Sequence, residues 1–166
     1  PRARTAHRPI GGRAKRTIDL MCALGLFGLL FPLWLLVVAA IRFGSPGPVF
    51  FAHERIGFRG RSFRCWKFRT MVVDGDAVLE AHFQRYPEAR LEWESDRKLK
   101  NDPRVTRFGR ILRKTSVDEL PQLLNVILGD MSLVGPRPVV ADELKLYGPE
   151  VKSYLAARPG ITGLWQ

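Results

Sequence analysis

Residues 20–41 read LMCALGLFGLLFPLWLLVVAAI and contain no charged side chain. At about 1.5 Å per residue, a helix of this length covers the roughly 30 Å hydrocarbon core of a bilayer. A buried core helix is one alternative, and a cleaved signal peptide with Arg13, Lys15 and Arg16 as its charged leader is another. The apolar run is long for either alternative in a chain of 166 residues, so we expect a membrane anchor.

Pro32 lies near the middle of this run. Its ring removes one backbone hydrogen bond and clashes with the preceding turn, at a cost of about 3 kcal/mol in a straight helix. A bend at Pro32 would give two arms, 20–31 and 32–41, that enter and leave the bilayer through one face. The positive-inside rule places both basic flanks on the cytoplasmic side. These flanks are Arg13, Lys15 and Arg16 before the run and Arg42, Arg55, Arg59, Arg61 and Arg64 after it. Spanning helices also tolerate proline, so the residues alone leave both arrangements open.

The composition restricts the class of partner and the class of site. Lys and Arg number 27 against 16 Asp and Glu, a net charge of +11, which favours nucleic acid, anionic lipid or phosphorylated substrates. The two cysteines, Cys22 and Cys65, indicate no disulfide framework and favour a reducing compartment. The histidines His7, His53 and His82 are scattered without ligand spacing, which argues against zinc.

The length admits one domain with a substantial core. We expect a basic leader or linker over residues 1–16, the re-entrant membrane helix over 17–43 and a cytoplasmic catalytic domain over 44–166, after the turn-rich GSPGP at 44–48. Because the chain begins with Pro1 and stops at Gln166 without a closing element, we expect it to be a piece of a longer protein.

The expected fold class is α+β, mainly helical, with a small β-hairpin. Strands are expected at 49–51 and 62–68, joined by a loop that contains Gly57 and Gly60. Helices are expected at 77–86, 89–99, 105–114, 120–128 and 151–157.

The helix expected at 105–114 is basic and amphipathic. Val105, Phe108, Ile111 and Leu112 share one face, and cationic side chains surround them. Such a helix lies either in the lipid headgroup layer or against an ordinary core with its basic side in water. The neighbouring membrane anchor favours the interfacial arrangement.

The stretch TSVDELPQ at 115–122 places two adjacent carboxylates at the start of a helix. Pro121 fits only in a first turn, so we expect the helix to begin near Asp118. Asp is a favoured cap, and Ser116 with Glu119 matches a capping box. On these residues alone the capping role is favoured.

Chemistry is the alternative role for this pair. A helix start binds anions, and Arg113, Lys114 and Arg137 could gather there around a diphosphate. Nearby cations favour ionised carboxylates, so one carboxylate could attack while the other binds a metal. Phosphates and oxygen ligands suit Mg²⁺.

Two further features are less specific. In GPRP at 135–138 two prolines hold Arg137 in a fixed backbone, which suits bidentate phosphate binding but is also common in surface turns. The basic band at 55–69 carries interleaved aromatic residues, as in single-strand nucleic-acid grooves, although ordinary strand alternation explains it equally well.

Taken together, the ordered motifs resemble those of the bacterial sugar transferase family of monotopic phosphoglycosyl transferases, and especially the undecaprenyl-phosphate galactose phosphotransferases. The resemblance covers nearly the whole chain, and so many motifs in one order make it specific. The motifs are AKRTID at 14–19, WKFRTM at 66–71, KLKNDPR at 98–104, the pair Asp118-Glu119, GDMSLVGPRP at 129–138 and RPGITGLWQ at 158–166.

The resemblance implies an enzyme that moves hexose-1-phosphate from a UDP-hexose (galactose or glucose) to undecaprenyl phosphate, the first step of a surface polysaccharide pathway. Asp118 would attack the β-phosphorus, release UMP and form a sugar-phosphoryl aspartate, which the polyprenyl phosphate then attacks. Glu119 would assist, and Mg²⁺ bound at Asp118 would neutralise phosphate charge. The cationic positions assigned to phosphate binding are Lys67, Arg69, Arg113 and Arg137.

The resemblance also implies re-entry at Pro32, contact with membrane lipid and a place on the cytoplasmic face of the bacterial inner membrane, with no nucleic-acid partner. It leaves open the hexose and whether a homo-oligomer forms. Two departures stand out: Phe31-Pro32 replaces the Ser-Pro often found at the bend, and the chain stops before the segment that usually follows GLWQ. Competing hypotheses are a membrane-tethered nucleic-acid or anionic-lipid binder and an inactive scaffold.

Overall fold

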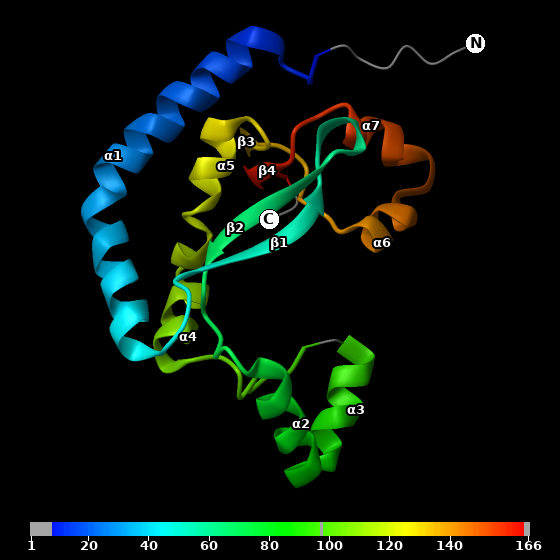
Figure 1. Ribbon diagram of the computed structural model, residues 1–166. Coiled ribbons are helices and arrows are strands. Elements are labelled where there is room, and N and C mark those ends of the chain that lie inside the picture. The colour runs from blue at the N-terminus through cyan, green and yellow to red at the C-terminus, as the bar shows by residue number, and fades with distance from the viewer. Residues whose placement is uncertain (1–7, 97, 165–166) are drawn as a thin grey trace.

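The computed structural model describes residues 8–96 and 98–164, the side chain of Asp96 excepted. Within these ranges the chain is mainly helical with two small two-stranded sheets, which confirms the expected mixture (Figure 1). Three expectations fall partly outside the described residues: the leader at 1–7, position 97 of the helix at 89–99, and positions 165 and 166 of the last motif. The division at residues 16 and 43 stays a prediction.

The first helix, α1 (Gly12–Gly44), is 33 residues long and continues through Pro32. The expected arms 20–31 and 32–41 are therefore one helical element, not two. Figure 1 shows it as an arc along one side of the other elements, convex away from them. Curvature toward a supporting core lets a helix accommodate a missing hydrogen bond without breaking.

One stripe of α1 packs against the rest of the chain. Its buried members are Asp19, Ala23, Trp34, Val37 and Ile41, and partly buried Phe27 and Leu30 fill the gap at helical spacing. The other faces are apolar and exposed: Leu29 is 75% accessible. By length and composition α1 is able to cross a membrane, and only 17% of its most apolar window is buried. This uncovered apolar surface is suited to membrane association.

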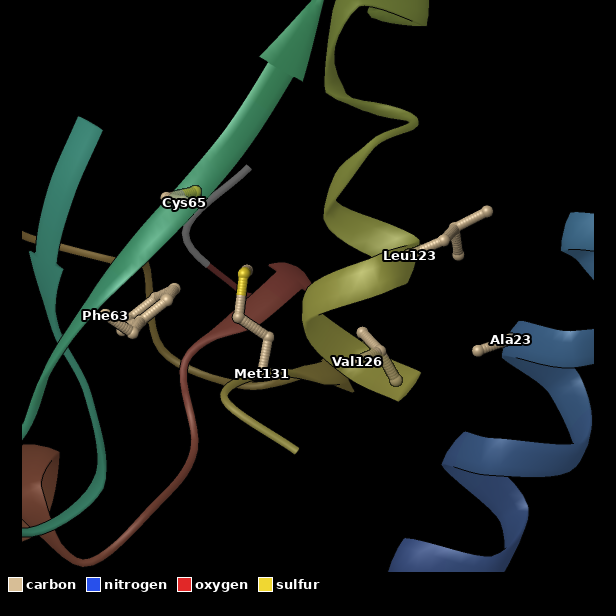
Figure 2. Packing of buried hydrophobic residues seen from close by; sticks show 6 residues of the cluster. All are labelled: Ala23, Phe63, Cys65, Leu123, Val126 and Met131. Atoms are coloured by element: carbon tan, nitrogen blue, oxygen red, sulfur yellow. The ribbon is translucent and has the colours of Figure 1, made fainter. Parts of the chain in front are cut away.

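Both halves of α1 contact the same body. Ala23 meets Leu123 and Val126 of α5 (Gln122–Leu128), which lie between it and Met131, Phe63 and Cys65 (Figure 2). The second cluster contains Trp34, Val37 and Ile41 with Phe68 of β2 (Ser62–Phe68) and Leu112 of α4 (Arg107–Lys114). The core therefore holds α1 along its length.

The apolar face of α4 is used by this second cluster. Leu112 is buried and Phe108 packs beside it, whereas Ile111 is exposed. The core thus covers most of the face that we expected the headgroup layer to cover, because α1 and β2 supply an apolar partner that the local sequence does not reveal.

The predicted hairpin is confirmed. The strand β1 (Phe50–Ile56) pairs antiparallel with β2, so that Phe51 faces Lys67 and His53 faces Cys65. A short 3₁₀ turn, Phe58–Gly60, connects them. The first strand is longer than expected. It continues past Phe51 into polar residues, whose side chains face water or a pocket on one side of the strand.

A second, parallel sheet was not predicted. It pairs β3 (Ser132–Val134) with β4 (Gly160–Thr162) across three short elements: α6 (Ala141–Leu144), the 3₁₀ segment Lys145–Glu150, and α7 (Val151–Leu155). A Cβ atom on Gly160 would lie 2.1 Å from the backbone nitrogen of Gly135. Only glycine permits this approach, which accounts for the glycines beside both proline-arginine motifs.

The helices α2 (Gly75–Arg85) and α3 (Pro87–Asp96) form an arm that projects from the body (Figure 1). They confirm the two expected helices, but each begins two residues earlier than expected, and α3 ends at Asp96, so Lys98 and Leu99 are not helical. The arm has its own small core of Leu79, Phe83 and Ala89, with Trp93 and Leu99 packed against it.

Candidate active site

Asp118 does not cap a helix. It lies within the 3₁₀ turn Val117–Glu119, and α5 begins only at Gln122, with Pro121 just before it. Ser116, which precedes the turn, has φ 55° and makes no capping hydrogen bond with its side chain. The expected helix start at Asp118 and the capping box are therefore wrong, because the turn that accommodates Pro121 separates the carboxylates from α5.

Asp118 and Glu119 line a pocket of about 710 Å³. Its walls come from β1, β2, the segment after β2, the start of the arm, and the end of α4. Five of the six residues proposed for chemistry or phosphate binding line the pocket: Lys67, Arg69, Arg113, Asp118 and Glu119. Arg137 is exposed and is not among the lining residues.

Lys67 and Glu119 form the ion pair of the pocket. The Lys67 Nζ atom donates to Glu119 Oε1 at 2.5 Å, and both side chains are about one-third exposed. Lys67 thereby connects β2 to the turn that carries Asp118. Water screens a pair of this exposure, so its main consequence is geometric.

Asp118 is 8% exposed and takes part in no ion pair among the described residues. Burial is the largest influence and raises the pKa of its carboxyl; Lys67 and Arg113 lower this pKa, and Glu119 raises it. The net direction is upward, opposite to the effect of the cations alone, because desolvation outweighs them. A partly desolvated carboxylate that is not held in an ion pair is a competent nucleophile once ionised.

Cys65 is the other potential nucleophile in the pocket wall. Burial raises the pKa of its thiol to about 11, although Lys67 and Arg55 oppose the change. The thiol is therefore protonated at neutral pH and unsuited to attack.

Two of the cationic residues have firm structural partners. Arg113 Nε donates to Thr70 Oγ1 at 2.9 Å, which fixes its guanidinium at the pocket wall. Arg69 donates through Nη1 and Nη2 to the carbonyl oxygens of Pro46 and Ser45 at 2.5 and 2.8 Å. Arg69 therefore attaches the segment after α1 to β2, a role that sequence reasoning missed.

Arg104 also lines the pocket and was not predicted. Its Nε and Nη2 atoms donate to both carboxylate oxygens of Asp102 at 2.9 and 2.7 Å, and its guanidinium lies 4.7 Å from the Trp93 ring centroid. Burial would raise the pKa of Asp102, but hydrogen bonds from Arg104 lower it overall. The pair links the arm to the pocket, and the NDPR motif was the available signal.

The described residues contain no group of three or more His, Cys, Asp or Glu side chains able to hold a metal ion. Two adjacent carboxylates do fit Mg²⁺, which takes one or two protein carboxylates and completes its shell with water and phosphate oxygens. Glu119 is engaged by Lys67, so Asp118 is the carboxylate left for such an ion.

The sequence profile of the family described as bacterial sugar transferase matches residues 10–166. This chain belongs to the bacterial sugar transferase family. It is 56% identical over 166 residues to the exopolysaccharide production protein ExoY of Rhizobium meliloti (strain 1021), covering all of this chain and 74% of that protein. It is 52% identical over 152 residues to the undecaprenyl-phosphate galactose phosphotransferase of Salmonella typhimurium, covering 92% of this chain and 32% of that protein.

A third relative bears a different sugar in its name. The chain is 45% identical over 155 residues to the UDP-glucose:undecaprenyl-phosphate glucose-1-phosphate transferase of Caulobacter vibrioides, covering 92% of this chain and 52% of that protein. The chain thus spans between about one-third and three-quarters of these three relatives. Their names support a transferase and the expected resemblance.

Proposed function

We propose that this chain is the catalytic part of a phosphoglycosyl transferase that moves hexose-1-phosphate from a UDP-hexose to undecaprenyl phosphate, giving undecaprenyl-diphosphate-hexose and UMP. The observation that carries the proposal is Asp118: a nearly buried carboxylate without an ion-pair partner among the described residues, in a cationic pocket. Relatives named for galactose and glucose transfer support the substrates, with the hexose left open.

The transfer takes two displacements. An ionised oxygen of Asp118 bonds to the β-phosphorus, the bond to the bridging oxygen breaks, and UMP leaves with that electron pair. The polyprenyl phosphate oxygen then bonds to the same phosphorus, which restores the Asp118 carboxylate. This is nucleophilic catalysis that divides one transfer into two steps.

The neighbouring side chains prepare Asp118 for this reaction. Lys67 lowers its pKa and holds Glu119 in place, and Arg113 adds a second cation fixed by Thr70. Mg²⁺ held by Asp118 would supply further neutralisation of phosphate charge. Phosphate binding by Arg137 stays a prediction that no contact among the described residues supports.

We place the chain on one face of the membrane, with the exposed apolar faces of α1 in the cytoplasmic leaflet of the inner membrane; re-entry at Pro32 stays a prediction, because α1 continues through Pro32 as one helical element. The support comes from packing: the same body contacts Ala23 near one end of α1 and Ile41 near the other. Arg16 near the amino-terminal end also donates to the carbonyl oxygens of Val126 and Ile127 in α5. A helix upright across a bilayer could not keep one folded body against both ends.

The test incubates the protein in lipid discs with Mg²⁺, undecaprenyl phosphate and a panel of UDP-sugars, and follows UMP release. A trapped intermediate is then located by peptide mapping. We expect hexose phosphate on the peptide that contains Asp118, loss of turnover in Asp118→Asn and normal turnover in Asp142→Asn, an exposed aspartate of α6. Unchanged turnover in Asp118→Asn would remove it as the nucleophile.

A further inference from the structure

One face of β1 lines the pocket without a role in the displacement chemistry. Side chains alternate between the faces of a strand, so Phe51, His53 and Arg55 share one face, and all three line the pocket that contains Asp118. Their cross-strand neighbours are Lys67, Cys65 and Phe63 respectively. The strand therefore extends from the ion pair of Lys67 toward the hairpin turn as one wall of the site.

The spacing along this wall suits an extended nucleotide. Phe51 is directly opposite Lys67, which binds Glu119 beside Asp118. At about 3.4 Å per residue, His53 is about 7 Å farther along the strand. A nucleoside diphosphate whose β-phosphate lies at Asp118 would place its nucleoside along these residues.

The other end of the pocket has a different character. Pro48, Met71 and Val73 line it, and it adjoins the segment that follows α1, the apolar helix. Arg69 and Arg104 line the pocket as well, so this end offers apolar and cationic side chains beside the membrane helix. That combination suits a lipid-linked phosphate, which leaves the end formed by β1 for the water-soluble substrate.

The side chains on β1 are suited to a planar base. Phe51 is 52% exposed, an unusual state for a phenyl ring beside a cationic pocket. Its ring centroid lies 6.3 Å from that of His53, with 40° between the two planes. An exposed aromatic ring next to a second ring offers a stacking surface for a nucleobase.

His53 also has a defined hydrogen-bonding pattern. Its Nδ1 atom lies 3.1 Å from the carbonyl oxygen of Glu54. A carbonyl oxygen only accepts, so Nδ1 carries the proton in this contact and Nε2 of the neutral ring is an acceptor. The N3–H group of uracil donates to such an acceptor, whereas N3 of cytosine is itself an acceptor.

We propose that Phe51 and His53 form the nucleoside subsite: Phe51 stacks on the base, and His53 Nε2 accepts from uracil N3–H and so selects uracil over cytosine. Arg55, paired with Glu143 at 3.7 Å, closes the far end. The proposal rests on the proposed function, because it takes the β-phosphate to lie at Asp118.

The test measures binding of UMP, CMP and inorganic pyrophosphate to the full chain in lipid discs by calorimetry. Base stacking predicts that Phe51→Ala weakens UMP binding about 5- to 150-fold, leaves pyrophosphate binding unchanged, and is rescued by Phe51→Tyr. His53→Ala should bring the UMP and CMP affinities together. The matched control is Tyr86→Ala, an exposed aromatic at the end of α2 that does not line the pocket, for which no change is expected.

Unchanged UMP binding in Phe51→Ala, or equal weakening of UMP and pyrophosphate, would overturn the subsite. So would a UMP preference that survives His53→Ala. Labelling of Asp118 by a UDP-hexose separates the two proposals. If labelling occurs while Phe51→Ala leaves UMP binding unchanged, the subsite alone is refuted. If labelling never occurs while the variants change UMP binding as expected, the proposed function alone is refuted.

Discussion

Asn125 offers the sharpest test of how the site is assembled. This fully buried side chain of α5 accepts from the backbone nitrogen of Trp66 at 3.0 Å and donates to the carbonyl oxygen of Arg64 at 2.8 Å. Both partners belong to β2, the strand that carries Lys67. Asn125 therefore holds the cation of the site in register with the turn that carries Asp118.

The change Asn125→Leu keeps the volume and removes both hydrogen bonds. Each backbone group left buried without a partner costs about 1–3 kcal/mol, so we expect a loss of about 2–6 kcal/mol in unfolding free energy. For a chain of this size each kcal/mol corresponds to about 2–4 °C, so the melting temperature should fall by at least about 4 °C. The rate of UMP release should fall as well, because Lys67 loses its fixed position relative to Glu119.

Thermal unfolding in lipid discs, followed by circular dichroism, measures the first effect, and UMP release below the melting transition measures the second. Gln84→Leu, on the exposed side of α2, is the control and should alter neither. The variant Asn125→Asp keeps the acceptor for Trp66 but sets a buried carboxylate oxygen against the carbonyl oxygen of Arg64, so it should also melt below the parent. A melting temperature for Asn125→Leu equal to that of the parent would refute the inference that Asn125 stabilises the contact between α5 and β2.

Three further changes test the site and the fold. Lys67→Gln removes the cation that most strongly lowers the pKa of Asp118 and releases Glu119, so the acid limb of the kcat/KM profile for UDP-hexose should move to higher pH; a limb that stays in place contradicts this. Asp118→Asn removes a buried carboxyl with a raised pKa. The protonated form is favoured in the folded state, so ionisation costs stability as pH rises through the folded pKa, and the variant should melt higher than the parent at neutral pH, with the difference vanishing in acid. Gly160→Ala would drive a Cβ atom into the backbone of Gly135, and we expect loss of folded protein on size-exclusion chromatography.

The changes at Lys67 and Gly160 have matched controls. Lys145→Gln removes an exposed lysine that pairs with Asp142 and is not among the residues that line the pocket, and it should leave the pH profile unchanged. Gly28→Ala adds a methyl group where no atom lies within 4 Å, and should yield folded protein. A folded, active Gly160→Ala variant would show that the parallel sheet tolerates a wider spacing.

Sequence reasoning identified the features that depend on neighbours along the chain. The apolar run, the hairpin and the helices of the arm each follow from a repeat or a turn signal within a few residues, because local backbone preferences and side-chain periodicity decide them. The pair Asp118-Glu119 was found in the same way. The neighbouring residues favour a capping role for this pair, because a capping box is also a local sequence pattern. That pattern does not reveal where α5 begins.

Contacts between segments far apart in the sequence decided the parallel sheet and the composition of the pocket. The approach of Gly160 to Gly135 joins two short strands that carry no periodic signal. Arg69 donates to carbonyl oxygens in the segment after α1. Arg104 and the β1 face reach the pocket only because β1, the arm and the turn after α4 converge there. The sequence alone determined the apolar run, the antiparallel hairpin and the helices of the arm. Only the tertiary structure decided which charges surround Asp118. The interaction between two charges depends on the distance between them, and these distances are fixed only after the apolar faces of the chain have packed.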